Sequence, residues 1–207
     1  MVTLMAKKKI RKSQPRGRRQ TGSRPLKKKV SFCAEGKSEE QYIKALIQKR
    51  YNSEIAVKFW RQRNRSSLKE LIDRARKRAN EEDTGEGIWI VCDSDENQSH
   101  IKPLINWLEE APEHRHAAVT EPCLEHWLLL HYVDSPDCNN AADAERKLKK
   151  HLSGYEKGSS LPDALIDATD EAVRRQALAG ATGAWSTPQI SQMRDLITWL
   201  DALRHNR

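Results

Sequence analysis

The sequence lacks the features that define several common classes of protein. It holds no run of about eighteen apolar residues, so we expect no membrane-spanning helix, and no apolar segment follows the basic N-terminal stretch as it would in a secretory signal. Its four cysteines show no CxxC spacing, which disfavours a zinc site or a disulfide framework and fits a reducing compartment. It contains no GxGxxG, Walker A or GxSxG motif, which disfavours a dinucleotide enzyme, a P-loop NTPase and an α/β-hydrolase. We therefore predict a cytoplasmic protein that makes no membrane contact and depends on a partner for any ATP hydrolysis.

The positive charge of the chain is concentrated at its N-terminus. Residues 1–29 hold twelve Lys and Arg and no acid; subtracting these from the 37 basic residues of the chain leaves 25 against 29 acids, a net charge of −4. A basic stretch with interspersed Gly and Pro cannot bury a core, so we predict a disordered tail over residues 1–28 and a folded domain over 29–207. The tail would attract RNA or DNA through counterion release, although a purely solubilising role is the open alternative.

Apolar runs and helical patterns alternate along the rest of the chain. Strands are predicted at residues 30–34, 55–60, 87–92 and 116–120, with helices between them at 38–51, 66–80 and 99–110. Beyond residue 121 only helical patterns occur, at 122–132, 141–153, 161–179 and 187–205. This order predicts an α/β fold with a central parallel sheet of about four strands, helices on both faces and a helical C-terminal part.

Acidic side chains follow two of the predicted strands. The run VSFCA ends at Glu35-Gly36, and the run GIWIVC ends at Asp93, with Asp95 two residues further on. Ligands of open parallel sheets bind outside the carboxyl ends of the strands. Residues two apart in extended backbone point the same way, so Asp93 and Asp95 would present their carboxylates together, facing Glu35 if the two strands are neighbours.

Three carboxylates in such proximity repel one another unless a cation or a proton lies between them. Mg²⁺ prefers oxygen ligands and binds through few carboxylates together with substrate phosphate, so we predict a Mg²⁺ site, which Mn²⁺ could also occupy. The alternative interpretation is that DSDEN is only a polar turn, because Asp, Ser and Asn are common turn residues.

Several basic residues are candidates for phosphate or nucleic-acid binding. Lys37 follows the Glu35-Gly36 turn, although a solvated surface lysine would be equally consistent. Residues 49–78 hold eleven Lys and Arg against three acids, with Phe59 and Trp60 among them; the candidates there are Arg61, Arg63 and Arg65. The alternative is an ordinary solvated helix face after a strand whose aromatic residues belong to the core.

The segment EPCLEHWLLLHY, residues 121–132, is similar to the Pro-Cys-Phe-Glu-x-Trp-Leu-Leu-Leu-His-Phe signature of RloB-like proteins. The segment EGKSE, residues 35–39, resembles the opening EG…TE motif of that family, and the pair of strand–EG and strand–DxD segments looks like the Toprim fold. The chain departs from the family pattern at Glu121, Leu124 and Ser38, where Asn, Phe and Thr are usual. These departures bear on the substrate more than on the fold.

The resemblance implies a Toprim-like nuclease of bacterial anti-phage defence, acting in abortive infection and encoded with an ABC-class ATPase. It implies that Glu35 acts as general acid or base and that Asp93 and Asp95 bind Mg²⁺. Glu125 matches the family signature and is a candidate fourth acid, or else a structural residue favoured by the helix dipole. His131 closes the same apolar segment, where a core histidine is the commoner explanation.

These observations lead to a Mg²⁺-dependent nuclease as the main hypothesis, with Glu35, Asp93 and Asp95 as catalytic residues and Glu35, Asp93, Asp95 and Glu125 as metal ligands. The rival hypothesis is a non-catalytic adaptor that binds nucleic acid through its tail and docks on an ATPase. A phosphoryl-transfer enzyme acting on a small phosphate is a third. The sequence leaves open whether the substrate is RNA or DNA and whether the chain forms a homo-oligomer.

Overall fold

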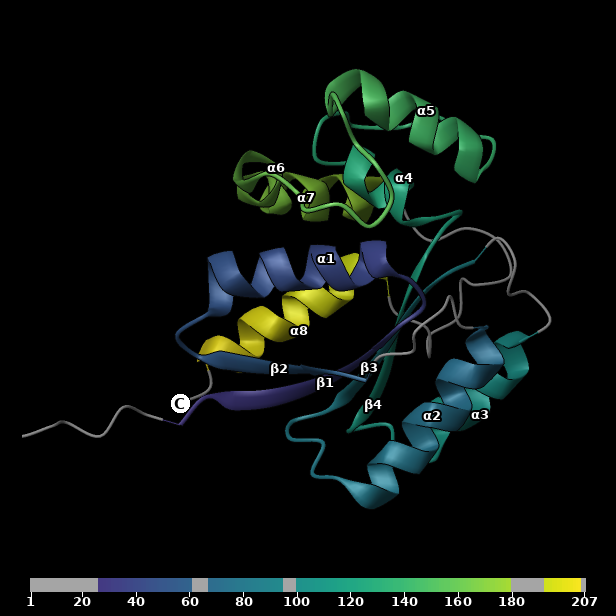
Figure 1. Cartoon of the computed structure of the whole chain (residues 1–207), viewed down its shortest axis with the longest axis vertical. Helices are drawn as coiled ribbons and strands as arrows, with labels where there is room; N and C mark the ends of the chain where they lie inside the picture. Colours follow the sequence, from purple (N-terminus) through teal and green to yellow (C-terminus); the bar gives the residue numbers. More distant parts are fainter. Residues whose placement is uncertain (1–25, 61–66, 95–99, 180–191, 206–207) are drawn as a thin grey trace, which may run out of the picture.

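The computed structural model describes residues 26–60, 67–94, 100–179 and 192–205. Four parallel strands form one sheet in the order β2-β1-β3-β4 (Figure 1). Their bounds are Lys28–Ala34 for β1, Ile55–Phe59 for β2, Ile88–Asp93 for β3 and Arg115–Thr120 for β4. The predicted α/β class is therefore confirmed, and the arrangement is consistent with a Toprim-like sheet.

Helices connect the strands and form the C-terminal part of the chain. Among the helices that the structure describes, none combines the length and apolar character needed to cross a lipid bilayer. The helices are α1 (Lys37–Leu46), which continues as a π-helical turn (Ile47–Tyr51), α2 (Leu68–Glu81), α3 (Ile101–Glu109), α4 (Leu124–Leu129), α5 (Ala141–His151), α6 (Asp163–Asp167), α7 (Thr169–Ala179) and α8 (Met193–His205).

The one long helix predicted over residues 161–179 is wrong, because two helices stand in its place. Ala168 leaves helical geometry, with a ψ of 10°, and separates α6 from α7. The Thr169 hydroxyl donates a hydrogen bond to the Ile166 carbonyl oxygen at 2.6 Å, which satisfies an acceptor at the end of α6. The apolar periodicity continues across this break and therefore conceals it.

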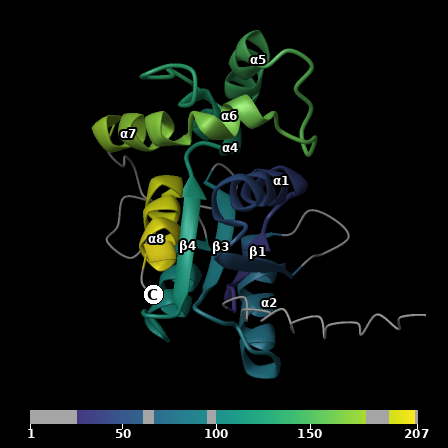
Figure 2. The same ribbon diagram turned by 90° about the vertical axis from the view of Figure 1, so that its left-hand side faces the viewer.

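The sheet is buried on both faces, as the uninterrupted apolar strands predict. Alternate side chains of a strand point to opposite faces, so Phe32 and Val91 join one core while Cys33 and Ile90 join the other. The first core includes residues of α1, α4 and α8, and the second includes residues of α2 and α3. Figures 1 and 2 show α1 and α8 on one side of the sheet, with α2 on the other.

The chain order places a topological switch point between β1 and β3. From β1 the chain moves outward to β2, and from β3 it moves outward on the opposite side to β4. In sheets of this kind, a crevice opens outside the carboxyl ends of the two strands at the switch point. Helices α4 to α7 lie beyond this edge, where the arrow of β4 points in Figure 2.

The predicted tail lies outside the described residues except for its last positions. Strand β1 begins at Lys28, at the predicted boundary between tail and domain. Lys28 and Lys29 are held on the fold, since Lys28 Nζ donates to the Leu203 carbonyl oxygen at 2.8 Å and Lys29 Nζ lies 3.0 Å from an Asp83 carboxylate oxygen. The disorder of residues 1–28 stays a prediction.

Candidate functional site

Glu35 and Asp93 meet at the switch point of the sheet. Strands β1 and β3 are paired in register, and the Glu35 N–H donates to the Val91 carbonyl oxygen at 2.9 Å. The Asp93 N–H then donates to Glu35 Oε2 at 3.1 Å. The structure thus brings together two acids that lie 58 positions apart in the sequence. Asp95, the third acid of the prediction, lies outside the described residues.

The Asp93 carboxylate is held from the neighbouring strand and helix. Thr120, which ends β4 and pairs with Asp93 in the strand register, donates its hydroxyl to Asp93 Oδ1 at 2.5 Å. The Leu124 N–H at the start of α4 donates to the same oxygen at 2.8 Å. Two donors therefore fix one oxygen of Asp93. Sequence reasoning missed Thr120, because only the register of two strands places its hydroxyl beside Asp93.

Glu39 is a buried acid that sequence reasoning did not include in the site. Its Oε2 accepts a hydrogen bond from the Gly36 N–H at 2.9 Å, so it caps the start of α1. A Cβ added at position 36 would lie 2.8 Å from that oxygen, so a larger residue there would require the Glu39 carboxylate to shift. The spacing of Glu39 three residues after Gly36 is the signal that could have identified this acid.

Glu125 also belongs to this acidic cluster, which we define as Glu35, Glu39, Asp93 and Glu125. It lies in α4 and is 1% exposed. The Tyr155 hydroxyl donates to Glu125 Oε1 at 2.9 Å, and Lys157 Nζ lies 3.6 Å from the same oxygen. The residue predicted as a candidate fourth acid thus lies with the others, and it has both a hydrogen-bond donor and a cation as partners.

Burial and mutual repulsion favour protonation within the acidic cluster. Burial, followed by the charge of Glu39, holds the pKa of Asp93 well above its usual range, although the Thr120 hydrogen bond acts in the opposite direction. Burial also raises the pKa of Glu39 to about 7, and the charges of Glu35 and Glu125 add to this effect. Carboxyl groups of this kind hold protons near neutral pH unless a cation replaces them.

The four side chains of the acidic cluster all offer carboxylate oxygens, which are the ligands that a hard divalent cation prefers. Burial raises the pKa values of Glu39 and Asp93, and the neighbouring carboxylates raise them further; a divalent cation would offset that repulsion. Within the described ranges, however, no three His, Cys, Asp or Glu side chains are spaced to share one metal ion. A complete ligand set would need Asp95 or a side-chain rotation inside the cluster.

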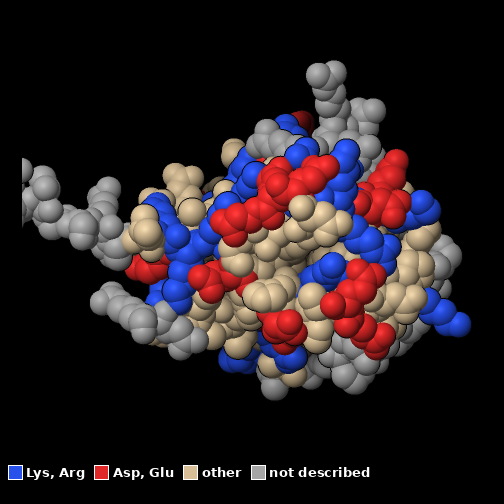
Figure 3. Space-filling model, turned by 90° about the horizontal axis from the view of Figure 1, so that it is seen from below, with Lys and Arg blue, Asp and Glu red and all other residues tan. Residues whose placement is uncertain are grey.

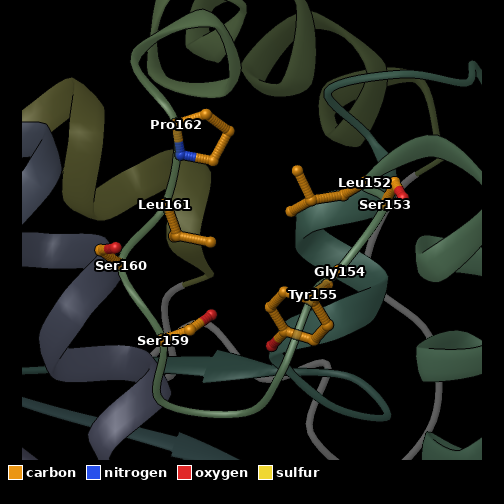
Figure 4. Close-up of a pocket in the computed structure, with 8 residues that line it drawn as sticks. All are labelled: Leu152, Ser153, Gly154, Tyr155, Ser159, Ser160, Leu161 and Pro162. Atoms are coloured by element: carbon orange, nitrogen blue, oxygen red, sulfur yellow. The ribbon is translucent and has the colours of Figure 1, made fainter.

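A loop from the C-terminal helices reaches down to this site. It connects α5 to α6, and Figure 4 shows its two arms, with Tyr155 and Ser159 at the lower end. A hollow of about 280 Å³ lies between the arms, lined by residues 152–155 and 159–162. The Gly158 N–H donates to Ser38 Oγ at 2.9 Å, so the tip of the loop contacts the first turn of α1.

The predicted phosphate-binding residues are only partly described. Lys37 lies in the first turn of α1 with an exposed side chain, next to the acidic cluster in sequence. Arg61, Arg63 and Arg65 lie outside the described residues, so their role stays a prediction.

The basic face of α2 is paired with acids. Arg76 lies 2.6 Å from Glu110, and Arg78 lies 2.6 Å from Glu82. Figure 3 shows Lys and Arg interspersed with Asp and Glu on the face seen from below. Trp60 is 5% exposed and belongs to the core. These contacts favour the ordinary solvated surface as the interpretation of α2.

His131 lies in the core rather than in the acidic cluster. Its Nδ1 is 3.1 Å from the Trp127 carbonyl oxygen, and its ring packs edge-to-face against Tyr42 and Trp127. Burial lowers the pKa of His131 to about 4, so the ring is neutral near pH 7. This environment favours a structural role.

The fold and the site together define an α/β protein with an acidic cluster at the switch point of a parallel sheet. A family model described as RloB-like protein matches residues 32–200. The chain therefore belongs to the RloB-like family, as its sequence motifs predict. No curated protein and no solved structure gives a match.

Proposed function

We propose that this RloB-like protein is a Mg²⁺-dependent nuclease that hydrolyses phosphodiester bonds in RNA or DNA. The observation that carries the proposal is the contact between Glu35 and Asp93 at the ends of the two central strands. It lies inside a cluster of four acids, three of them buried and Asp93 half-buried. Catalytic sites commonly combine a switch-point crevice with carboxyl groups of perturbed pKa.

The acids perform two tasks in this proposal, metal binding and proton transfer. Asp93 and Asp95 would hold the metal ion, with Glu35 and Glu125 as further oxygen ligands. Bound Mg²⁺, or Mn²⁺ in its place, supplies charge neutralisation for the scissile phosphate. Glu35 would take a proton from the attacking water, and the Thr120 hydroxyl keeps the Asp93 carboxylate oriented.

The biological setting is proposed from the family resemblance. This resemblance implies an effector of bacterial anti-phage defence that acts in the cytoplasm beside an ABC-class ATPase. The absence of a Walker A motif from the sequence fits such a division of labour, because ATP hydrolysis would then belong to the partner.

The decisive experiment measures Mg²⁺-dependent cleavage of RNA and DNA by Asp93→Asn and Glu35→Gln variants. Both substitutions nearly preserve side-chain shape, and we expect each to lower kcat by at least about a hundredfold. Asp73→Asn is the control, because Asp73 lies in an exposed ion pair with Lys69 on α2. Cleavage at the wild-type rate in either cluster variant would refute the proposal.

The adaptor hypothesis is the alternative, and one observation favours it: the described acids are not spaced to share a metal ion. A non-catalytic adaptor would bind nucleic acid through residues 1–25, with an affinity that falls steeply as salt rises. Deleting those residues would abolish binding, whereas Asp93→Asn would leave it unchanged. Binding with that pattern and without cleavage would favour the adaptor.

A further inference from the structure

The loop between α5 and α6 is attached to α4 on one side of Lys157 and to α1 on the other. On one side the Tyr155 hydroxyl donates to Glu125 Oε1 at 2.9 Å, and on the other the Gly158 N–H donates to Ser38 Oγ at 2.9 Å. Gly158 has a φ of +75°, and a Cβ there would lie 2.9 Å from Lys37 Cδ. The backbone on either side of Lys157 is thus fixed by contacts with α4 and α1.

These attachments place a cation between the acidic cluster and the solvent. Lys157 Nζ lies 3.6 Å from Glu125 Oε1 and 3.9 Å from Glu145 Oε2. The Lys157 side chain is 52% exposed, whereas that of Glu125 is 2% exposed. The ammonium group therefore lies on the solvent side of the buried acid, where a substrate would arrive.

The distances leave hydrogen-bonding capacity on this ammonium group. Charge-assisted hydrogen bonds between an ammonium and a carboxylate are typically about 2.8 Å long, and both contacts of Lys157 are longer. A lysine ammonium has three donors on a flexible stem, so it can turn toward an incoming anion without leaving Glu125. A phosphate diester that approached four acids unaided would be repelled, and Lys157 offsets that charge.

We propose that Lys157 contacts a phosphate group of the nucleic-acid substrate beside the acidic cluster, held in place by the Tyr155 and Gly158 attachments. This inference rests on the proposed function and adds a substrate-contacting residue to it. The C-terminal helices thereby supply one side of the binding site, whereas the sheet supplies the acids.

The test compares Lys157→Gln and Lys157→Arg with wild-type protein, all as the full chain. Binding to a fluorescein-labelled single-stranded RNA and to its DNA counterpart is measured by anisotropy at about 0.15 M salt, with Ca²⁺ in place of Mg²⁺. Lys150→Gln is the control, because Lys150 is an exposed lysine on the neighbouring helix α5. Residues 1–25 are present in every variant, so any contribution from them is common to all.

We expect Lys157→Gln to weaken binding by about tenfold and Lys157→Arg by less than about threefold, because the arginine keeps the charge. Lys150→Gln should change the affinity by less than about twofold. The melting temperatures should agree, because Lys157 is half-exposed and both of its ion pairs are longer than a hydrogen bond. Equal affinities for Lys157→Gln and Lys150→Gln would overturn the inference. A lower melting temperature of Lys157→Gln with unchanged affinity would also overturn the inference. A wild-type protein that binds neither oligonucleotide would overturn it as well.

The same variants separate this inference from the proposed function. Binding that depends on Lys157, combined with no Mg²⁺-dependent cleavage by wild-type protein, would refute the nuclease and retain the phosphate contact. Cleavage that depends on Asp93 but not on Lys157 would support the nuclease and refute the phosphate contact of Lys157.

Discussion

At the scale of single residues, opposing effects set the protonation of the acidic cluster. The hydrogen bond from Thr120 favours the charged form of Asp93, whereas burial and the charge of Glu39 favour the protonated form, and the second group of effects prevails. Burial also has the largest effect on Glu39 and favours its protonated form, whereas backbone hydrogen bonds favour its charged form. Protons and divalent cations would therefore compete for the same oxygens.

The first prediction concerns the pH dependence of stability. Unfolded Glu39 has the ordinary pKa of 4.5, and burial raises its folded pKa to about 7, so the folded state holds its proton more tightly. Its contribution to stability is fully present below pH 4.5 and is lost as pH rises through about 7, a change of about 3 kcal/mol. Glu39→Gln, which cannot titrate, should flatten this decline.

The measurement is the free energy of unfolding in urea, without divalent cations, at about pH 5 and about pH 8. His131 changes the stability with pH in the opposite direction in both proteins. Its folded pKa is lowered to about 4, so the stability falls as pH drops below 6.5. The comparison between wild type and Glu39→Gln therefore cancels the contribution of His131. It leaves the contribution of Glu39 together with the effect of its charge on the pKa of Asp93. An identical difference between the two pH values in both proteins would contradict the prediction.

The residues of the site differ in how far the sequence reveals them. Glu35 and Asp93 could be predicted because each directly follows an apolar run in the sequence. Thr120 and Tyr155 could not, because their hydroxyls reach the cluster only through strand register and through a loop from distant helices. Local patterns record burial and turns, whereas these contacts depend on the packing of separate elements.

At the scale of elements, the loop between α5 and α6 offers a paired test with two glycines. Gly154 and Gly158 have φ values of +76° and +75°, so alanine strains the backbone equally at both. A Cβ at Gly154 meets nothing within 4 Å, whereas a Cβ at Gly158 collides with the Lys37 side chain.

We expect both alanine variants to lose about 1 kcal/mol of stability from the strained backbone. Gly158→Ala alone should also weaken oligonucleotide binding, because the loop tip would move away from α1 and take Lys157 with it. Urea titration and anisotropy measure the two effects separately. Equal binding by both variants would mean that the position of the loop tip has no effect on the site.

The strands were easier to predict than the ends of the helices. All four predicted strands are present, because each is a short apolar run between polar turns. The helix predicted from residue 122 begins only at Leu124, since Cys123 is extended, with a φ of −157°. Side-chain periodicity determines which face of a helix is buried, but single backbone angles determine where the helix starts and stops.

At the scale of the whole molecule, one sheet separates two apolar cores. Leu196 of α8 belongs to the first core and Leu71 of α2 to the second, and both are fully buried. Leu196→Ala and Leu71→Ala should each cost about 2–5 kcal/mol through lost burial and a residual cavity. Because both cores rest on the same strands, each variant should still unfold in one transition.

The check is urea unfolding followed by circular dichroism and by tryptophan fluorescence, with coincident curves expected. Two separated transitions in either variant would show that the cores unfold independently. The apolar strands in the sequence predicted that helices cover both faces of the sheet. The sequence did not specify the strand order β2-β1-β3-β4, because apolar runs of this kind fit several arrangements.

The acidic cluster draws on segments that leave the ribosome at different times. Glu35 and Asp93 emerge with the sheet, whereas the hydroxyl that holds Glu125 and the neighbouring ammonium group come from positions 155 and 157. A nascent polypeptide can therefore pair its central strands before the lysine at position 157 has been added.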